Sequence, residues 1–425
     1  MSGTGVLPIA APTRRLAWTV TGTAARASLK GLVEFLVVGG ATLLLFPLVW
    51  LLRWATDLDT SELIVGFVTF HAAAVINDPH FSVTYLLFYK NARARWFGIE
   101  SDAGASSVAS KKQRLRYVFA GVLVPLVLAG WAISAIVTRS AVSLGLMMQL
   151  MFFLVGWHYV KQGFGVLVVL SARQGMFLSA RERGWILTHC FCAWFYARAS
   201  PADPGREYLE QGVVFTSLPH PPGLEAVTQA AFWLSTLGLG WALVNAWRRN
   251  HRLPPLAALG GFLVTVWLWV VYSSVDPLMV YLIPALHSVQ YLYFVWLMKR
   301  NEARAQEGPP LFRRPVAVRV GILAVSAIGL GWLLLHGAPT FFDATLAASD
   351  TERAGDLGVT PYLAAFVTFV NLHHYFMDSV LWRRDNPETR FLSRDHDAIP
   401  RPASDTARGT APDTAPDPDT AGQPA

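Results

Sequence analysis

The chain has 425 residues, of which 53% are hydrophobic and only 15% are charged. A soluble domain averages about 25% charged residues, so this composition excludes an ordinary globular enzyme, a collagen and a coiled coil. Two cysteines, Cys190 and Cys192, exclude a disulfide-rich secreted scaffold. The net charge of +7 is typical of the basic loops of a membrane protein, and we expect no nucleic-acid partner.

Apolar blocks long enough to cross a bilayer recur along the whole chain. A membrane-spanning helix needs about 20 residues, within a range of about 17–25. The fifth block is short, and the second and fourth are long. The sequence predicts an all-α, polytopic helical bundle of about ten transmembrane helices, near residues 31–52, 62–89, 117–138, 141–171, 184–198, 224–247, 254–275, 277–298, 315–336 and 358–382.

Lys and Arg alternate between the two sides of this predicted bundle. Of the 35, 29 fall on the side that holds both termini, five fall on the other side, and Lys161 lies within a span. Because basic loops stay in the cytoplasm, we expect both termini to be cytoplasmic, in a bacterial inner membrane. The predicted organisation is a cytoplasmic arm over 1–30, a transmembrane bundle over 31–384 and a disordered cytoplasmic tail over 385–425.

Six of the eleven histidines fall on the second, fourth, eighth and tenth spans, which run in the same direction through the membrane. Counted from the outer ends at 1.5 Å per residue, the set lies within about 12 Å of depth. Ionisable side chains at such depth usually face the interior of a bundle. The six histidines that we expect to gather in one layer are His71, His80, His158, His287, His373 and His374. His336 falls at a span end and is given no role.

The second span contains the segment from His71 to His80, with Asp78 and Pro79 near its end. Seven residues separate His71 from Asp78, so the two share a face of a continuous helix. His80 would face the opposite side of a straight helix. Pro79 removes an amide donor and favours a kink, which could bring His80 to the same cavity.

The other three spans place polar partners beside their histidines. On the tenth span His374 and Asp378 are four residues apart and share a face, whereas His373 points about 100° away. On the fourth span Lys161 follows His158 by three residues. Lys161 could pair with Asp78 or Asp378, or hold an anionic head group.

Neutral imidazole and carboxylate groups are ligands for iron, zinc, manganese and copper. A few histidines with a carboxylate and open positions suit non-haem iron and oxygen chemistry, so iron is favoured, although imidazole ligands alone do not separate it from zinc or copper. The expected ligands are His71, His80, His158, His287, His374 and Asp378. The expected catalytic groups are Asp78, Lys161 and Asp378, and the partners expected to support the ligands are Asn77, Gln290, Asn371, His373 and Tyr375.

Three other interpretations stay open. Asp78, Lys161 and Asp378 could belong to a proton-coupled transporter, although no internal repeat is visible. His71 and His287 could bind a haem, which would leave the acidic and basic residues unexplained. The polar side chains could also hold the helices together in a structural or assembly protein without chemistry.

The dispersed histidines are similar in character to those of the Brp/Blh carotene-cleaving dioxygenases, which are multi-span proteins with one intramembrane iron. The segment Asp78-Pro79-His80 resembles their Pro-His element. His373-His374 resembles part of a histidine box of the membrane fatty-acid desaturases and hydroxylases. Both resemblances cover only a few residues, and membership in either family is not assigned.

The sequence therefore predicts an integral membrane protein with an intramembrane, His-rich metal site. The expected activity is that of a metal-dependent oxidoreductase, such as a non-haem iron oxygenase or hydroxylase, on a lipid or other apolar substrate. A molecule already dissolved in the bilayer would reach a site at this depth most easily. No nucleotide-binding loop or common hydrolase motif occurs, and the sequence does not determine the oligomeric state.

Overall fold

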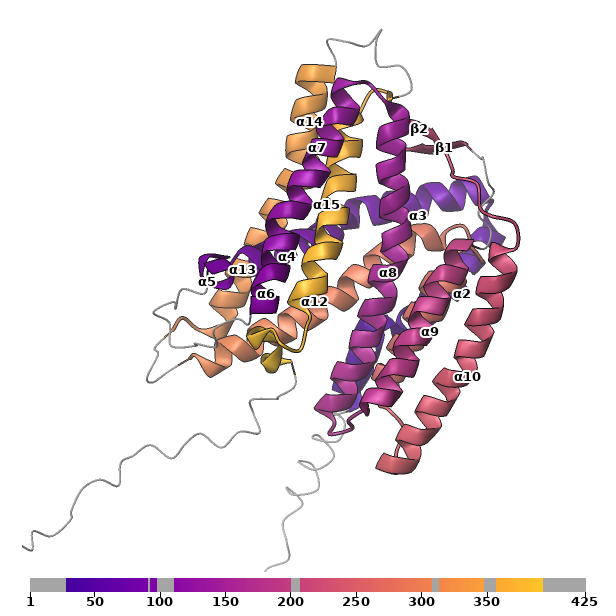
Figure 1. Ribbon diagram of the computed structural model, residues 1–425, viewed down its shortest axis with the longest axis vertical. Helices are drawn as coiled ribbons and strands as arrows, with labels where there is room; N and C mark the ends of the chain where they lie inside the picture. The colour runs from indigo at the N-terminus through magenta and orange to yellow at the C-terminus, as the bar shows by residue number, and fades with distance from the viewer. Residues whose placement is uncertain are drawn as a thin grey trace, which may run out of the picture.

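The computed structural model describes residues 28–90, 92–97, 111–199, 207–307, 313–347 and 357–392. Within these residues the chain is almost entirely helical, which confirms the predicted all-α class. One antiparallel hairpin, β1 (Glu207–Glu210) and β2 (Val213–Thr216), lies between two of the long helices in the sequence. Figure 1 shows the helices side by side, with this hairpin toward the upper right of the bundle.

Helices occur in each of the ten segments where an apolar block predicts one. In the first half of the chain they are η1 (Leu36–Gly40), α2 (Thr42–Ala55), α3 (Leu58–Ala73), α4 (Asn77–Tyr89), α5 (Ala92–Phe97), α6 (Lys111–Val118), η2 (Phe119–Leu123), α7 (Val124–Val137), α8 (Ala141–Arg173) and α9 (Ala180–Ala199). In the second half they are α10 (Leu224–Asn250), α11 (Leu256–Leu263), η3 (Val264–Val271), α12 (Met279–Ala305), α13 (Val316–Trp332), η4 (Leu333–Gly337), α14 (Ala338–Phe342), η5 (Asp343–Ala347), α15 (Pro361–Leu381) and η8 (Pro387–Phe391).

Six helical segments of the described residues are long and apolar enough to cross a membrane, and one bent pair would make a seventh. The structure thus supports a membrane helical bundle. The count of ten spans and the cytoplasmic position of the termini stay predictions. Residues 1–27 of the predicted arm (1–30) and residues 393–425 of the predicted tail (385–425) lie outside the described residues.

The bent pair is the first apolar block. Its two parts, Ser28–Gly40 and Thr42–Ala55, meet at an angle of 60°. Gly39 has a φ of 133°, a backbone conformation that side chains with a Cβ rarely adopt. The glycine therefore allows the chain to turn at this point, and the Val38 carbonyl next to it becomes free to accept a hydrogen bond from another helix.

The second apolar block is interrupted between α3 and α4, at residues 74–76. Ile76 leaves the helical conformation, with φ −120° and ψ −60°. Pro79 then lies in the first turn of α4, where a missing amide donor costs nothing. The expectation that His71 and Asp78 share the face of one helix is therefore wrong, because the interruption breaks the helical register between them.

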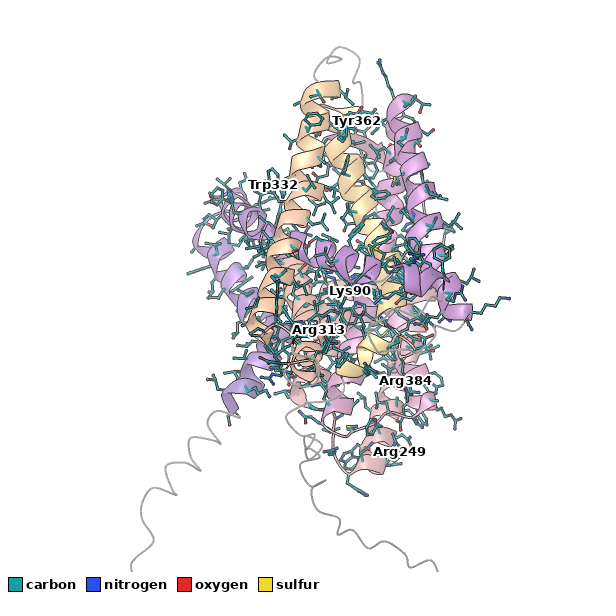
Figure 2. The ribbon with its side chains drawn as sticks, turned by 90° about the vertical axis from the view of Figure 1, so that its left-hand side faces the viewer. Lys90, Arg249, Arg313, Trp332, Tyr362 and Arg384 are labelled. Carbon is teal, nitrogen blue, oxygen red and sulfur yellow. The ribbon has the colours of Figure 1, made fainter. Side chains whose placement is uncertain are left out.

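Close packing between α4 and α13 fixes the position of α4. A Cβ atom on Gly331 would lie 2.7 Å from the backbone carbon of Asp78, so only glycine fits there. The adjoining residue Trp332 is 56% exposed and lies on the outer side of α13 in Figure 2. Apolar side chains exposed in this way suit a surface that faces lipid.

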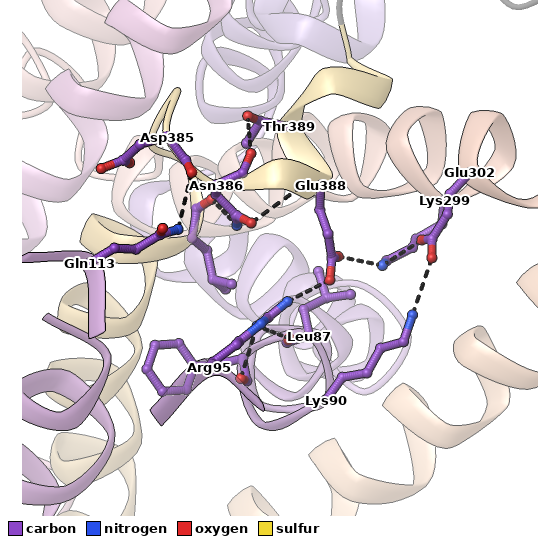
Figure 3. Close-up of polar contacts among 12 residues, drawn as sticks. Leu87, Lys90, Arg95, Gln113, Lys299, Glu302, Asp385, Asn386, Glu388 and Thr389 are labelled. Atoms are coloured by element: carbon purple, nitrogen blue, oxygen red, sulfur yellow. Dashed lines mark hydrogen bonds and ion pairs between the residues drawn. The ribbon is translucent and has the colours of Figure 1, made fainter. Parts of the chain in front are cut away.

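A network of ion pairs closes one end of the bundle (Figure 3). Glu388 in η8 contacts Arg95 at 2.5 Å and Lys299 at 2.7 Å. Glu302 contacts Lys299 at 2.8 Å and Lys90 at 3.2 Å. These pairs attach η8 to α5 and α12. η8 lies within the first residues of the predicted tail, 385–392, and the tail boundary stays a prediction.

Candidate metal centre

Four side chains from three helices meet inside the bundle. They are His80 of α4, His158 of α8, and His374 and Asp378 of α15. One ligand atom of each lies within 4.8 Å of the ligand atoms of the other three. All four side chains are buried, and His374 is fully inaccessible. The group could therefore hold a metal ion.

Local sequence accounts for the way each helix presents its ligands. His374 and Asp378 are four residues apart on α15, so they stack on one face. The Asp343 carboxylate accepts hydrogen bonds from the Tyr362 and Leu363 amides at 2.9 and 3.0 Å, which caps the start of α15. α4 presents His80 to the interior of the bundle, and the break in the helix lies at residues 74–76, before Pro79.

The distances within the group leave room for an ion between the donors. Oδ2 of Asp378 lies 3.4 Å from Nε2 of His374 and 3.8 Å from Nδ1 of His158. The ring centroid of His374 is 4.5 Å from that of His80 and 4.9 Å from that of His158. Ligands of one ion at bond lengths of about 2.0–2.2 Å are separated by similar distances.

Several ring nitrogens in the group have no hydrogen-bond partner among the described residues. They are both nitrogens of His374 and Nε2 of His80. Buried polar atoms are normally hydrogen-bonded, because an unpaired one costs about 1–3 kcal/mol. Coordination of a cation would satisfy these atoms, so the donor set fits a metal ion.

His287 of α12 lies beside the group rather than within it. Its Nε2 is 3.0 Å from Nε2 of His158, and its Nδ1 has no hydrogen-bond partner among the described residues. A separation of 3.0 Å suits a hydrogen bond between two imidazoles. It also suits two neighbouring ligands of one ion at bond lengths of about 2.1 Å. The predicted role of His287 as a ligand stays a prediction.

Tyr291 of α12 orients the Asp378 carboxylate. Its hydroxyl donates a hydrogen bond to Oδ1 of Asp378 at 2.8 Å. The Tyr291 hydroxyl oxygen lies 2.6 Å from the Thr84 hydroxyl and accepts a hydrogen bond from the Trp382 indole at 3.2 Å. Oδ2 is thereby left to face His374 and His158. Sequence reasoning missed all three supporting residues, because the contacts join helices that are far apart along the chain.

Three of the partners expected to support the ligands lie around the group. Ser288 donates to Oδ1 of Asn77 at 2.8 Å and lies 3.1 Å from Nδ1 of His80. The Tyr375 ring stacks on the His158 ring with centroids 4.9 Å apart. The Tyr375 hydroxyl donates to Asn371 at 3.1 Å. Asn77 and Asn371 thus support the histidines only through an intermediate residue.

Three of the predicted site residues do not join the group. His71 is exposed on α3, with Nδ1 2.8 Å from the Phe67 carbonyl of its own helix, so its expected place among the ligands is wrong. His373 contacts the Tyr85 hydroxyl and the Ala120 carbonyl, each at 3.0 Å. Gln290 bonds the Val38 carbonyl and accepts from Gln162, which ties α12 to η1 and α8.

Asp78 and Lys161 also lie apart from the group. Asp78 pairs with His336 of η4 at 2.8 Å, and sequence reasoning had given His336 no role. The two residues are 258 positions apart, so no local pattern could have joined them. Among the described residues, Lys161 forms no ion pair with Asp78 or Asp378. The alternative in which Lys161 pairs with either carboxylate is therefore wrong, and the alternative of an anionic head group stays a prediction.

Comparison with protein-family models, curated proteins and solved structures found no match. What the described residues support is a membrane-type helical bundle whose buried His/Asp group could bind a metal ion.

Proposed function

We propose that the protein is a membrane-embedded, metal-dependent oxidoreductase that acts on a lipid or another apolar substrate. The observation that carries this proposal is the buried group of His80, His158, His374 and Asp378. Three imidazoles and one carboxylate from α4, α8 and α15 converge there. A group that only joined helices would not leave both nitrogens of His374 without a hydrogen bond from the described residues.

The donor set favours iron. Imidazole with carboxylate is the ligand combination of non-haem iron sites that react with oxygen, and neither cysteine belongs to the group. A redox-active metal bound there would supply the capacity to activate dioxygen. The chain's own contributions are orientation and exclusion of water. Tyr291 holds Asp378, the Tyr375 ring covers His158, and burial keeps the ligands dry.

The position of the group supports an apolar substrate. The ligands lie in the interior of a bundle whose outer surface carries many exposed apolar side chains, such as Leu126, Val325 and Trp332. Such a surface faces the hydrocarbon of a bilayer. A substrate dissolved in that hydrocarbon would approach the group without crossing water. We place the protein in a bacterial inner membrane with both termini in the cytoplasm, as the distribution of basic residues predicts.

Oxygen uptake tests the proposal. The detergent-solubilised protein is loaded with Fe²⁺ and mixed with a bacterial membrane-lipid extract and ascorbate as reductant. We expect oxygen consumption and a new oxidised lipid in the mass spectrum, both lost in His374→Ala. His71→Ala is the matched control, because His71 lies on a span outside the group, and it should retain both signals. An iron-loaded protein that consumes no oxygen and oxidises no lipid would contradict the proposal.

A proton-coupled transporter is the rival from another functional class. It requires Asp78, Lys161 and Asp378 to lie along one path. Asp78 instead pairs with His336, and Asp378 is held by Tyr291. A proton flux in proteoliposomes that persists after metal removal and disappears in Asp78→Asn would favour the transporter.

A further inference from the structure

Three tyrosine rings lie against histidines of the candidate metal centre, and one of them differs from the other two. The three are Tyr159, Tyr291 and Tyr375. The Tyr291 ring centroid is 4.4 Å from that of His80 and 5.7 Å from that of His374. Among the described residues, only Tyr291 of the three also contacts a tryptophan ring, that of Trp382, with centroids 5.3 Å apart. Tyr291 therefore lies between the ligands and a second oxidisable ring.

A continuous chain of hydrogen bonds follows the same route. Nε1 of the Trp382 indole donates to the Tyr291 hydroxyl at 3.2 Å, and this hydroxyl donates to Oδ1 of Asp378 at 2.8 Å. The direction of the chain is fixed, because an indole nitrogen only donates and a carboxylate only accepts. Asp378 is itself one of the four clustered ligands. The bonds are thus oriented for proton movement from Trp382 toward the metal centre.

The two ends of this chain differ in their exposure. Tyr291 is 2% exposed and Asp378 is 7% exposed. Trp382 follows the last residue of α15 and is partly exposed. A small cavity lined in part by Trp382, Asn386 and Glu388 adjoins the indole, at the end of the bundle that Figure 3 shows. A molecule outside the bundle can therefore contact the indole, whereas it cannot contact the phenol or the ligands.

The proposed chemistry creates a need that this route can meet. Oxidation of a substrate by dioxygen at a metal consumes single electrons and protons. Burial of the four ligands keeps a soluble reductant away from them. Phenol and indole rings lose one electron more readily than most other side chains, and a phenol does so most easily when a base accepts its proton. Tyr291 has such a base in Asp378.

We infer that Trp382 and Tyr291 form a relay that carries one electron and one proton at a time from the edge of the bundle to the metal centre. Tyr291 gives an electron to the oxidised centre while its O–H bond breaks, and the proton bonds to Oδ1 of Asp378. The N–H bond of Trp382 then breaks, and its electron and proton restore the phenol. A one-electron reductant such as ascorbate, with a proton from water, restores the indole. This inference rests on the proposed function for the oxidant.

Photochemical oxidation of the metal-free, full-length protein in detergent tests the relay alone. Under illumination, ruthenium(II) tris-bipyridine with persulfate takes electrons from exposed rings, and mass spectrometry locates the oxidised residues. The electron then leaves Trp382 and Tyr291 in turn, while the phenol proton moves to Asp378. Tyr375 is the internal control, since it is also 2% exposed but bonds an amide oxygen. Because a positioned base typically speeds proton transfer by about 10²–10⁴-fold, oxidised Tyr291 should exceed oxidised Tyr375 by about tenfold or more.

Two variants decide whether both members of the route are needed. Trp382→Phe keeps a ring but removes the oxidisable indole, and Asp378→Asn removes the base while it keeps the indole. Each should lower the oxidation of Tyr291 about tenfold or more. Trp296→Phe changes an exposed tryptophan of the same helix as Tyr291, and it is the matched control that should behave like the wild type.

Two results would overturn the relay. One is equal oxidation of Tyr291 and Tyr375 in the wild type. The other is unchanged oxidation of Tyr291 in a folded Trp382→Phe. A loss of stability alone would not move oxidation from one buried tyrosine to another, so the measurement distinguishes a relay from a merely structural hydrogen bond.

Iron-loaded protein separates this inference from the proposed function. At saturating iron, dioxygen without substrate should produce a tyrosyl radical in the electron paramagnetic resonance spectrum, absent in Tyr291→Phe. Ascorbate should remove this radical more slowly in Trp382→Phe, which should still bind iron because Trp382 is not a clustered ligand. Transfer from Trp382 to Tyr291 in a protein that binds no iron would refute the oxidoreductase and keep the redox pair. Iron binding and oxygen use without oxidation of Tyr291 would refute the relay and keep the oxidoreductase.

Discussion

The buried His/Asp group and the ion-pair network around Glu388 are both clusters of ionisable side chains. They differ in whether their polar atoms have ion-pair or hydrogen-bond partners. In the network, every carboxylate faces an ammonium or guanidinium group (Figure 3). In the group, the nitrogens of His374 have no hydrogen-bond partner among the described residues. Charged groups that all pair with one another indicate a structural role. Ring nitrogens that converge without a hydrogen bond indicate a binding site.

The difference also appears in what each cluster connects. The network joins segments close to one end of the bundle and holds η8 against α12. The group joins α4, α8 and α15 deep inside and has its own support from Tyr291. Substitutions in the network should therefore affect stability more than metal binding, and substitutions around the group should do the opposite.

The largest stability effect is expected from Lys299→Met in the network. The side chains of Lys299 and Glu302 are each only 9% exposed, and removal of the cation that joins them leaves Glu302 with Lys90 alone and Glu388 with Arg95 alone. Breaking a buried ion pair costs about 3–5 kcal/mol. Thermal unfolding in detergent should show this loss. Arg116→Met, in a more exposed pair, is the control and should cost about 0–1 kcal/mol. An equal loss of stability in Lys299→Met and Arg116→Met would contradict the larger contribution of the buried pair.

A smaller loss of stability is expected from Gly331→Ala. The added Cβ would meet the Asp78 backbone at 2.7 Å and push α4 away from α13. Overpacking of this kind costs about 1–3 kcal/mol. Because α4 carries His80, metal binding should weaken as well. Gly329→Ala is the matched control, since no atom lies within 4 Å of its added Cβ. Unfolding midpoints that decrease equally in both variants would contradict the close approach.

Tyr291→Phe should weaken metal binding with little effect on folding. The change removes the hydroxyl that orients Asp378, and the loss of such a supporting partner typically costs 10- to 100-fold in metal affinity, or roughly 1–3 kcal/mol. Competition against a chelator of known affinity measures the change. The control is Tyr293→Phe on the same helix, whose hydroxyl bonds Glu34 instead. An unchanged affinity in Tyr291→Phe would show that Asp378 is not a ligand.

The smallest effect is expected from acid titration of the network. Burial alone would raise the pKa of Glu388, but Lys299 and Arg95 outweigh it and hold the pKa below the ordinary value of 4.5. A lowered pKa in the folded state stabilises the fold above pH 4.5, and this contribution disappears as the pH falls through the folded value. Unfolding free energies measured between pH 6 and pH 3 should decrease over that window. If the unfolding free energy of Glu388→Gln depends less on pH than that of the wild type, the Glu388 carboxyl is the source of the pH dependence. An identical dependence in the two proteins would exclude Glu388 as the source.

Local patterns predicted the parts of the site that lie within one helix. The four-residue spacing of His374 and Asp378 placed both on one face of α15, and they meet in the group. Pro79 predicted a kink that would bring His80 to the cavity of His71, but the break lies at residues 74–76, before Pro79. The prediction for His71 failed, because the helix is interrupted before Asn77 and a face cannot be continued across such a break.

Contacts between distant helices were beyond the reach of sequence patterns. The hydrogen bonds of Tyr291 with Thr84 and Asp378 span 207 and 87 positions. Which residue of one helix faces which residue of another depends on packing, and no periodicity along a single helix encodes it. The same limit applies to the pair of Asp78 with His336.

Elemental analysis of the purified protein tests the central claim most directly. The wild type, His374→Ala and His71→Ala are compared after identical purification in detergent. The structure predicts about one metal ion per chain in the wild type and in His71→Ala, and none in His374→Ala, whose fold is verified by circular dichroism. A wild type without metal, or a folded His374→Ala that keeps its metal, would contradict the assignment of the buried group as a metal centre.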